Sequence, residues 1–169
     1  MCDQPPSLEQ LYQAIEQHLR DHLPGVQTVS FWPDIADAIP LPAVFLDISD
    51  IGSGSDTGTG QTTLAVTFEA RIIVDSIRPE HYPQALHLAT QLAVLLRAQT
   101  WGLAVGPAEF QRSTQDWTRP ELDGYTVWLV EWSQVIYLGE QQWPWPDQPP
   151  GTLLISLNDE DAISPEDLS

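Results

Sequence analysis

The chain has 169 residues, of which 42% are hydrophobic, so it can bury the core of one domain without disulfides or a structural metal. It carries 24 acidic residues against 6 basic ones, for a formal net charge of -18. A surface this acidic excludes ordinary nucleic-acid binding, because cations are needed to displace the counterions of a phosphate backbone. It fits a surface that resists aggregation, a protein that DNA passes without being held, or a protein that imitates DNA.

The N-terminal region and the cysteine content bear on the cellular compartment. Cys2 is the only cysteine, so the sequence offers neither an internal disulfide nor a thiolate metal site. The opening residues MCDQPPSLEQ lack the basic and then apolar segments of a secretory signal, and no stretch is long and apolar enough to cross a membrane. We therefore expect a cytoplasmic origin.

The first predicted element is a helix that begins after Ser7. Ser7 can cap the helix while Gln10, three residues later, reaches back to it in a capping box. Apolar residues then recur at helical spacing as far as about Leu23. Pro24 and Gly25 end the helix, and a short strand is expected over residues 26–31.

Two strands joined by a polar loop follow. Residues 43–49, AVFLDIS, have the composition of a strand. In residues 62–75 the even-numbered positions are apolar from Leu64 to Val74 and the odd-numbered positions are mostly polar, which predicts a long strand with one buried face. The intervening residues 51–61, IGSGSDTGTGQ, are too many for a tight turn, so we expect a long β-hairpin with a flexible tip.

The second half of the chain predicts one more helix and two more strands. Residues 79–99 have the broad apolar face of a helix. Residues 105–115 are more polar, with Pro107 near their start, which is typical of an edge strand. Residues 125–138, YTVWLVEWSQVIYL, are apolar on both faces, as expected in the middle of a sheet, and the Asp123-Gly124 turn would pair them with the preceding strand.

The composition changes at Glu140, which divides the chain into two regions. Residues 140–169 are rich in proline and tryptophan and then in acids, with 7 acidic residues and no basic one. The order helix, strands, helix, strands in residues 1–139 predicts an α+β domain, with an antiparallel sheet, two helices packed on one face and a long β-hairpin. Residues 140–169 are expected to form an extended C-terminal arm.

The loop also contains Asp56-Thr57-Gly58, the tripeptide that surrounds the catalytic carboxylate of aspartic proteases. Catalysis there needs a rigid, apolar setting and a second carboxylate, whereas Asp56 is flanked by glycines and no second such tripeptide exists in the chain. A phosphate-binding loop is disfavoured as well, because the chain has no lysine and a strand, not a helix, follows.

No other pattern of chemically active residues predicts an active site, a cofactor or a metal. His18 and His22 share one face of the first helix, but no third ligand accompanies them, and no serine lies in a nucleophile elbow. Trp128 and Trp132 share one strand face and are expected in the core. Trp143 and Trp145 are different, because they lie in a proline-stiffened arm and need a surface to bury them, either the protein's own sheet or, as we favour, a neighbouring subunit.

Two segments carry a resemblance to a known family. They are HYPQALHLATQLAVLLRAQTWG and the final strand YTVWLVEWSQVIYLG, within residues 62–139. In their order and patterns they resemble the tail-terminator (tail-completion) proteins of long-tailed bacteriophages, particularly the branch of Mu-like contractile phages. The helix and hairpin before them are consistent with that family, while the residues after Glu140 go beyond the match.

This resemblance implies a structural protein of the virion, in the tail or neck, that assembles in the host cytoplasm. Such proteins form a six-membered ring that caps the tail tube, ends polymerisation of tube and sheath, and joins the tail to the head-side connector. The implied partners are further copies of the chain, the tube and sheath proteins and the connector, while DNA passes through the ring without specific binding. No enzymatic activity or cofactor is implied.

The resemblance gives roles to residues that the pattern alone leaves unexplained. The loop and the arm would contact a neighbouring subunit or the tube through Asp50, Ile51, Gly52, Ser53, Gly54, Ser55, Asp56, Thr57, Gly58, Trp143 and Trp145. Carboxylates that could line an acidic channel are Asp56, Glu69 and Asp75. The alternatives are another phage neck or head-closure protein, an acidic DNA-mimic inhibitor and a dimeric aspartic protease.

Overall fold

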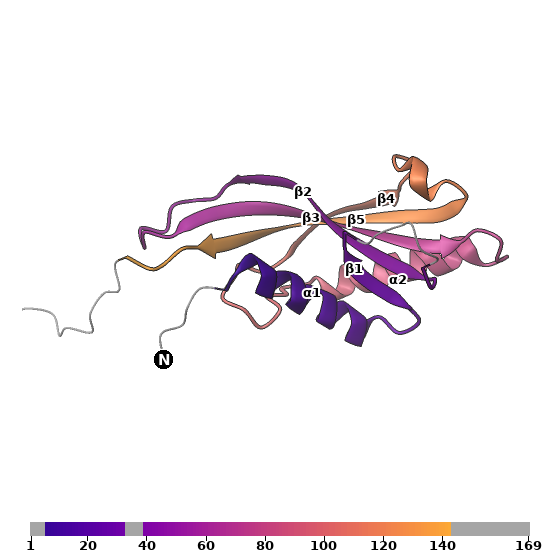
Figure 1. Cartoon of the computed structure of the whole chain (residues 1–169), viewed down its shortest axis with the longest axis horizontal. Coiled ribbons are helices and arrows are strands. Elements are labelled where there is room, and N and C mark those ends of the chain that lie inside the picture. Colours follow the sequence, from indigo (N-terminus) through magenta and orange to yellow (C-terminus); the bar gives the residue numbers. More distant parts are fainter. Residues whose placement is uncertain (1–5, 33–38, 143–169) are drawn as a thin grey trace, which may run out of the picture.

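The computed structural model describes residues 6–32 and 39–142. Within these ranges the chain forms two α-helices, a five-stranded sheet and one short 3-10 helix, so the predicted α+β class is confirmed (Figure 1). In chain order they are α1 (Leu8–His22), β1 (Thr28–Phe31), β2 (Ala43–Ser53), β3 (Thr62–Asp75), α2 (His81–Leu95), β4 (Glu109–Gln115), η1 (Pro120–Leu122) and β5 (Tyr125–Leu138).

The helix α1 begins where the sequence predicts. The backbone N–H of Gln10 donates to Ser7 Oγ at 3.2 Å, and the backbone N–H of Ser7 donates to Gln10 Oε1 at 2.8 Å. This reciprocal capping box satisfies donors that the first helical turn leaves without intrahelical partners. Leu11, Ile15 and Leu19 then form the buried stripe.

The sheet has the strand order β1-β2-β3-β5-β4, with β3 in the middle and β4 at one edge. β3 pairs antiparallel with β5 along its whole length, from Thr62 opposite Leu138 to Asp75 opposite Tyr125. The prediction of an edge strand paired with β5 is confirmed, although that strand is shorter than expected and begins at Glu109. β5 is an interior strand beside the central one.

The sheet is mixed, which corrects the expectation of a purely antiparallel one. β1 pairs with β2 in parallel, with Thr28 opposite Ala43 and Phe31 opposite Leu46. Both strands therefore start at the same end of the sheet, and the chain between them must return along the length of β1 before β2 begins. β1 spans four residues, so it pairs with the first part of β2 alone.

Both helices lie on one face of the sheet, here called the inner face (Figure 1). The even-numbered residues of β3 from Val66 to Val74 point into this layer and are no more than 1% exposed. Phe68 stacks on Trp132 of β5 with ring centroids 5.3 Å apart, which confirms the expected place of Trp132 in the core. On the opposite, outer face a smaller cluster of Ala43, Phe45, Ile73, Leu122 and Val127 is covered in part by η1.

A buried glutamine fastens β5 to the segment that follows α2. Gln134 is 2% exposed, and its Oε1 accepts a hydrogen bond from Trp101 Nε1 at 2.9 Å. Its Nε2 donates to the carbonyl oxygen of Gly106 at 2.7 Å. These bonds satisfy both ends of a buried amide, so they set the position of residues 99–108 against the sheet.

We expect Ser7→Ala to lower the free energy of unfolding by about 1 kcal/mol, because α1 loses the side chain that caps it. For a domain of this size that loss corresponds to a melting temperature about 3 °C lower, measurable by calorimetry. Ser55→Ala, in the exposed loop, is the matched control and should leave the melting temperature unchanged. Equal melting temperatures for all three proteins would contradict the role of the cap.

Candidate functional site

The β2–β3 hairpin extends past both helices and forms one end of the molecule (Figure 1). β2 continues through Ser53, so Ile51, Gly52 and Ser53 belong to the strand, together with Asp50, and not to the predicted loop of residues 51–61. They pair with Thr67, Val66, Ala65 and Leu64 of β3, after a bulge between Ile48 and Asp50. The connecting loop is therefore residues 54–61.

The glycines of this loop allow close backbone contacts. A Cβ on Gly54 would lie 2.5 Å from Thr63 Cγ2, and one on Gly60 would lie 2.6 Å from Cβ of Gln142. Gly60 also has a φ of +79°, which favours glycine. The backbone N–H of Gln142 donates to the carbonyl oxygen of Thr59 at 2.9 Å, so the loop is held against the chain that follows β5.

Asp56 lies at the exposed tip of the loop. Its Oδ1 accepts a hydrogen bond from the backbone N–H of Gly58 at 2.8 Å, which closes a small Asx turn. Thr57 and Thr59 hydroxyls lie 2.8 Å apart beside it. These contacts account for Asp56-Thr57-Gly58 as a turn. A phosphate-binding loop leads into the N-terminus of a helix, whereas this loop leads into the strand β3.

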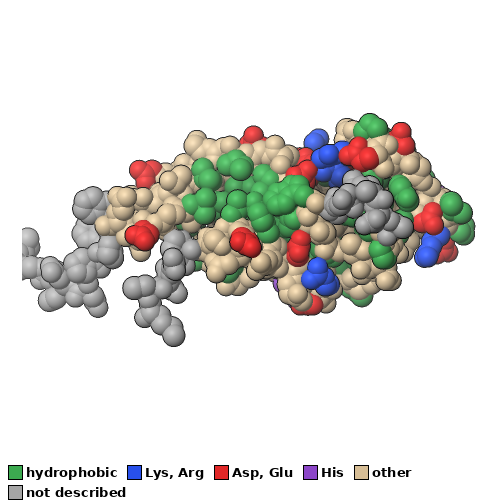
Figure 2. Space-filling model, viewed as in Figure 1, with side chains coloured by type: hydrophobic (Ala, Val, Ile, Leu, Met, Phe, Trp, Pro, Cys, Tyr) green, Lys and Arg blue, Asp and Glu red, His purple; other side chains and the backbone are tan. Residues whose placement is uncertain are grey.

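An apolar patch lies at the base of the hairpin, along the β2 edge of the sheet and next to α1. We define it as Tyr12, Trp32, Ile48, Ile51 and Leu64. Trp32 and Ile51 are each 54% exposed, and the rings of Tyr12 and Trp32 meet edge to face at a centroid distance of 4.9 Å. Figure 2 shows hydrophobic side chains gathered on this face of the molecule. A contiguous exposed patch of this kind marks an interaction surface.

Beside the apolar patch, one edge of β2 has no neighbouring strand among the described residues. The last backbone bond to β1's side runs from the N–H of Trp32 to the carbonyl oxygen of Leu46, at 3.2 Å. Asp47 then ends the pairing, because its Oδ1 accepts from Trp32 Nε1 at 2.7 Å and from the backbone N–H of Ile48 at 2.8 Å. We call residues 49–53 the free edge of β2.

The outer face carries a network of arginines and carboxylates. The buried Arg71 of β3 donates from Nε to Asp116 Oδ2 at 2.7 Å and from Nη2 to Glu69 Oε2 at 2.5 Å. Arg119 pairs with Asp47 at 2.9 Å, and Arg112 pairs with Glu131. Three of the six arginines are thus held in ion pairs on this face. A cavity of about 240 Å³ lies beside Arg71 and Arg119.

The network shifts the pKa values of its buried members. Burial alone would lower the pKa of Arg71, but its hydrogen bonds and ion pairs with Asp116 and Glu69 outweigh burial and raise the pKa. Burial alone would raise the pKa of Asp116, but hydrogen bonds from Thr118 and Arg71 outweigh it and lower the pKa. Both side chains are therefore charged at neutral pH and stabilise each other.

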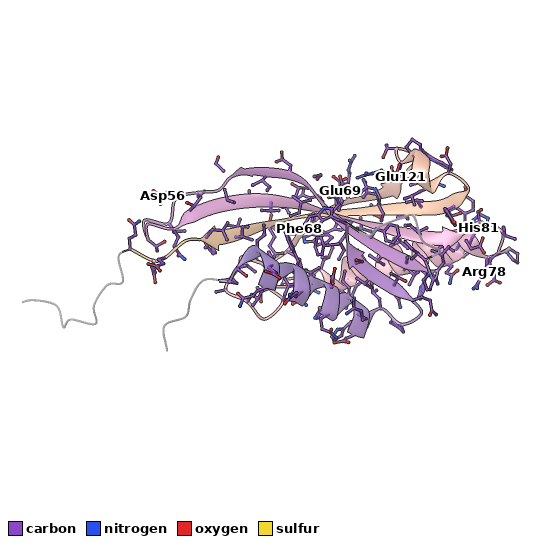
Figure 3. All side chains as sticks on the ribbon, viewed as in Figure 1. Asp56, Phe68, Glu69, Arg78, His81 and Glu121 are labelled. Carbon is purple, nitrogen blue, oxygen red and sulfur yellow. The ribbon has the colours of Figure 1, made fainter. Side chains whose placement is uncertain are left out.

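The three carboxylates expected to line a channel are spread along the hairpin and β3. Asp56 lies at the hairpin tip and Glu69 near the middle of the sheet (Figure 3). Asp75 ends β3 at the opposite end, where its Oδ1 accepts from the backbone N–H of Ile77 at 3.0 Å. Glu69 is paired with Arg71, so Asp56 and Asp75 are the members that lack an arginine partner among the described residues.

The two helical histidines pack against each other instead of forming a ligand cluster. His18 and His22 stack with ring centroids 4.1 Å apart, and burial is the main cause that lowers the pKa of His18. His18 Nε2 lies 3.1 Å from Gln99 Nε2, which joins α1 to the segment after α2. Across residues 6–32 and 39–142, no three His, Cys, Asp or Glu side chains lie together as a metal site.

The sequence alone did not predict the arginine network or the apolar patch. Arg71 and Asp116 are 45 residues apart, so the only local signal was the odd-numbered, outer-face position of Arg71 in β3. Trp32 follows a short predicted strand, and nothing nearby in sequence shows that its ring meets Tyr12. Trp143 and Trp145 lie outside the described residues.

No protein-family model matches the chain, and a search of curated proteins gives no match either. In the part of the chain that the structure describes, neither helix is long and apolar enough to span a bilayer.

We expect Asp116→Asn to destabilise the protein by about 3 kcal/mol at pH 7, because it leaves the buried Arg71 with one carboxylate instead of two. The folded-state pKa of Asp116 is lowered, so its contribution is present above the unfolded pKa of about 4 and is lost as pH falls through the folded pKa. The difference between the variant and the wild type should therefore shrink below pH 4.

The measurement is urea denaturation at several pH values, with Glu121→Gln as the control. Glu121 pairs with Arg119 at 3.5 Å and both side chains are 41% exposed, so its loss should cost less than about 1 kcal/mol. Equal losses for the two variants, or a loss for Asp116→Asn that does not change with pH, would contradict this account.

Proposed function

We propose that this chain is a structural protein of a bacteriophage virion. Copies form a ring, six in number by the resemblance described above, that caps the tail tube and ends polymerisation of tube and sheath. The same ring joins the tail to the head-side connector. The observation that carries the proposal is the hairpin that extends past the helices, with an apolar patch exposed at its base.

The apolar patch supports assembly into a ring, because apolar surface exposed to water is unfavourable and contact with a neighbouring subunit would bury it. Trp32 and Ile51 are each more than half exposed, so they are available for a neighbouring subunit to cover. Fully burying one such side chain stabilises a contact by about 1.5–3 kcal/mol. In a ring the same contact recurs at each junction and joins two different surfaces of neighbouring subunits. Such a head-to-tail contact forms a closed ring when the rotation from one subunit to the next divides a full turn evenly.

The charge supports passage of DNA through the ring. At a formal charge of -18 per chain, an assembled ring repels phosphate groups at short range, so DNA moves through without being held. Asp56 and Asp75 are candidates for the channel wall. Glu69 contributes less to the channel field, because Arg71 neutralises it.

The remaining contacts follow from the hairpin and the arm. In the proposed assembly residues 54–58 at the hairpin tip meet the tube or the next subunit, and Trp143 and Trp145 clamp a neighbour in the ring or the sheath. Within one chain the hydrogen bond between Gln142 and Thr59 already holds the loop in place. Contact of the hairpin tip with a partner therefore costs little further conformational entropy.

The proposal is tested by light scattering of the purified protein, at low and moderate salt, followed by negative-stain imaging of the peak. We expect a mass of about six copies of the 18.8 kDa chain and a ring with a central hole. A stable dimer at every concentration would contradict the ring.

The matched variants are Ile51→Asp, within the apolar patch, and Val94→Asp, on α2 and 74% exposed. Ile51→Asp should shift the mass to the single chain, because each junction loses about 2 kcal/mol of apolar burial and gains a carboxylate in an acidic assembly. Val94→Asp should retain the mass of the wild type. The opposite order would show that another surface joins the subunits.

A further inference from the structure

The free edge of β2 and the apolar patch beside it form one docking surface. The edge offers unpaired backbone groups at residues 49–53, and the inner side of the same stretch offers Ile48 and Ile51. Its occupant must therefore satisfy two conditions at once. It must be an extended strand, to pair with the backbone, and it must carry apolar residues on one face.

The C-terminal arm contains a segment that meets both conditions. Residues 152–157 read TLLISL, in which Leu153, Ile155 and Leu157 alternate with Thr152, Leu154 and Ser156. This is period 2 with one fully apolar face. Residues 148–158 also contain no charged side chain, in an arm that is otherwise acidic, so this stretch approaches Asp50 without charge repulsion.

The place where the described chain ends argues for a partner copy. β5 runs toward the hairpin tip, and Gln142 lies against Thr59 there (Figure 1). The nine residues 143–151 include four prolines, at 144, 146, 149 and 150. At about 3.1 Å per residue, an extended chain of nine residues can span roughly 28 Å. Antiparallel pairing with β2 of the same chain would require the chain to reverse its direction within these nine residues.

We propose that residues 152–157 of one subunit add as an antiparallel strand to the free edge of β2 in the next subunit. This inference rests on the self-assembly proposed above and names the segment that joins the copies. In this register Leu153 lies opposite Ile51, so that Leu153 and Ile155 cover the apolar patch. A register shifted by one residue would instead place these side chains on the outer face.

Cysteine cross-linking tests the pairing and the register. With Cys2 replaced by Ser, the variant Asp50→Cys with Leu154→Cys places two thiols directly opposite each other on the outer face, within reach of a disulfide. The control variant, Thr114→Cys with Leu154→Cys, uses β4 at the other edge of the sheet, where Thr114 is exposed. Both proteins are oxidised as equal mixtures of ¹⁵N-labelled and unlabelled full-length chains.

The expected result is a ladder of covalent oligomers from the first variant only, with hybrid-labelled peptides joining positions 50 and 154. Bonds within single chains would overturn the assignment to a neighbour, and no bond at all would overturn the pairing. If scattering shows a ring without this bond, the further inference fails and the proposed function stands. Covalent dimers without larger species would support strand exchange and count against the ring.

A second measurement follows hydrogen exchange at the free edge in the assembled protein. Leu153→Ser with Ile155→Ser removes the apolar face of the segment, and Leu154→Ser changes the opposite face. The first variant should lose about tenfold or more of the exchange protection at those amides of residues 49–53 that point away from β3, since their partner strand is released. Leu154→Ser should stay close to the wild type. Unchanged protection in both variants would overturn the proposal.

Discussion

The structure depends on the alternation of side chains along β3. This strand is central and pairs with β2 on one side and β5 on the other, so its two rows of side chains set both faces of the sheet. The even-numbered row is almost fully buried against the helices, and Phe68 at its middle stacks on Trp132. The odd-numbered row supplies Glu69 and Arg71 to the outer face. A shift of one residue would exchange the two rows and bury the ion pair in the core.

The outer face shows how a very acidic chain uses its few cations. Arg71, Arg112 and Arg119 each pair with a carboxylate from a different strand or loop, so each pair links separate parts of the sheet. Arg71 is the most buried of the three, and two carboxylates compensate for its loss of water. Because the chain has 24 acidic residues against 6 basic ones, acidic side chains dominate how the surface interacts with a polyanion such as DNA.

The elements with strong local signals could be predicted, and those set by distant pairing could not. The capping box at Ser7 and the bounds of β3 and β5 follow from residues a few positions apart. β2 extends through Gly52 because its pairing with β3 outweighs the weak strand preference of glycine. The parallel pairing of β1 and the contact of Arg71 with Asp116 join residues distant in sequence, and no local pattern indicates them. Of the expected interface residues, Asp50 to Gly58 lie along the hairpin, while the roles given to Trp143 and Trp145 stay predictions.

The difference in length between β1 and β2 leaves one edge of the hairpin without a neighbouring strand among the described residues. β1 pairs with four of the eleven residues of β2, and Asp47 closes that pairing with two hydrogen bonds to its side chain. Beyond Asp47 the strand continues, with Ile51 more than half exposed, where a chain built to stay single would end the strand or place charges along its edge. The bulge at Ser49 and the carboxylate of Asp50 disfavour indiscriminate pairing there. Such an edge favours a strand that is uncharged and apolar on one side, as the proposed contact between strongly acidic copies requires.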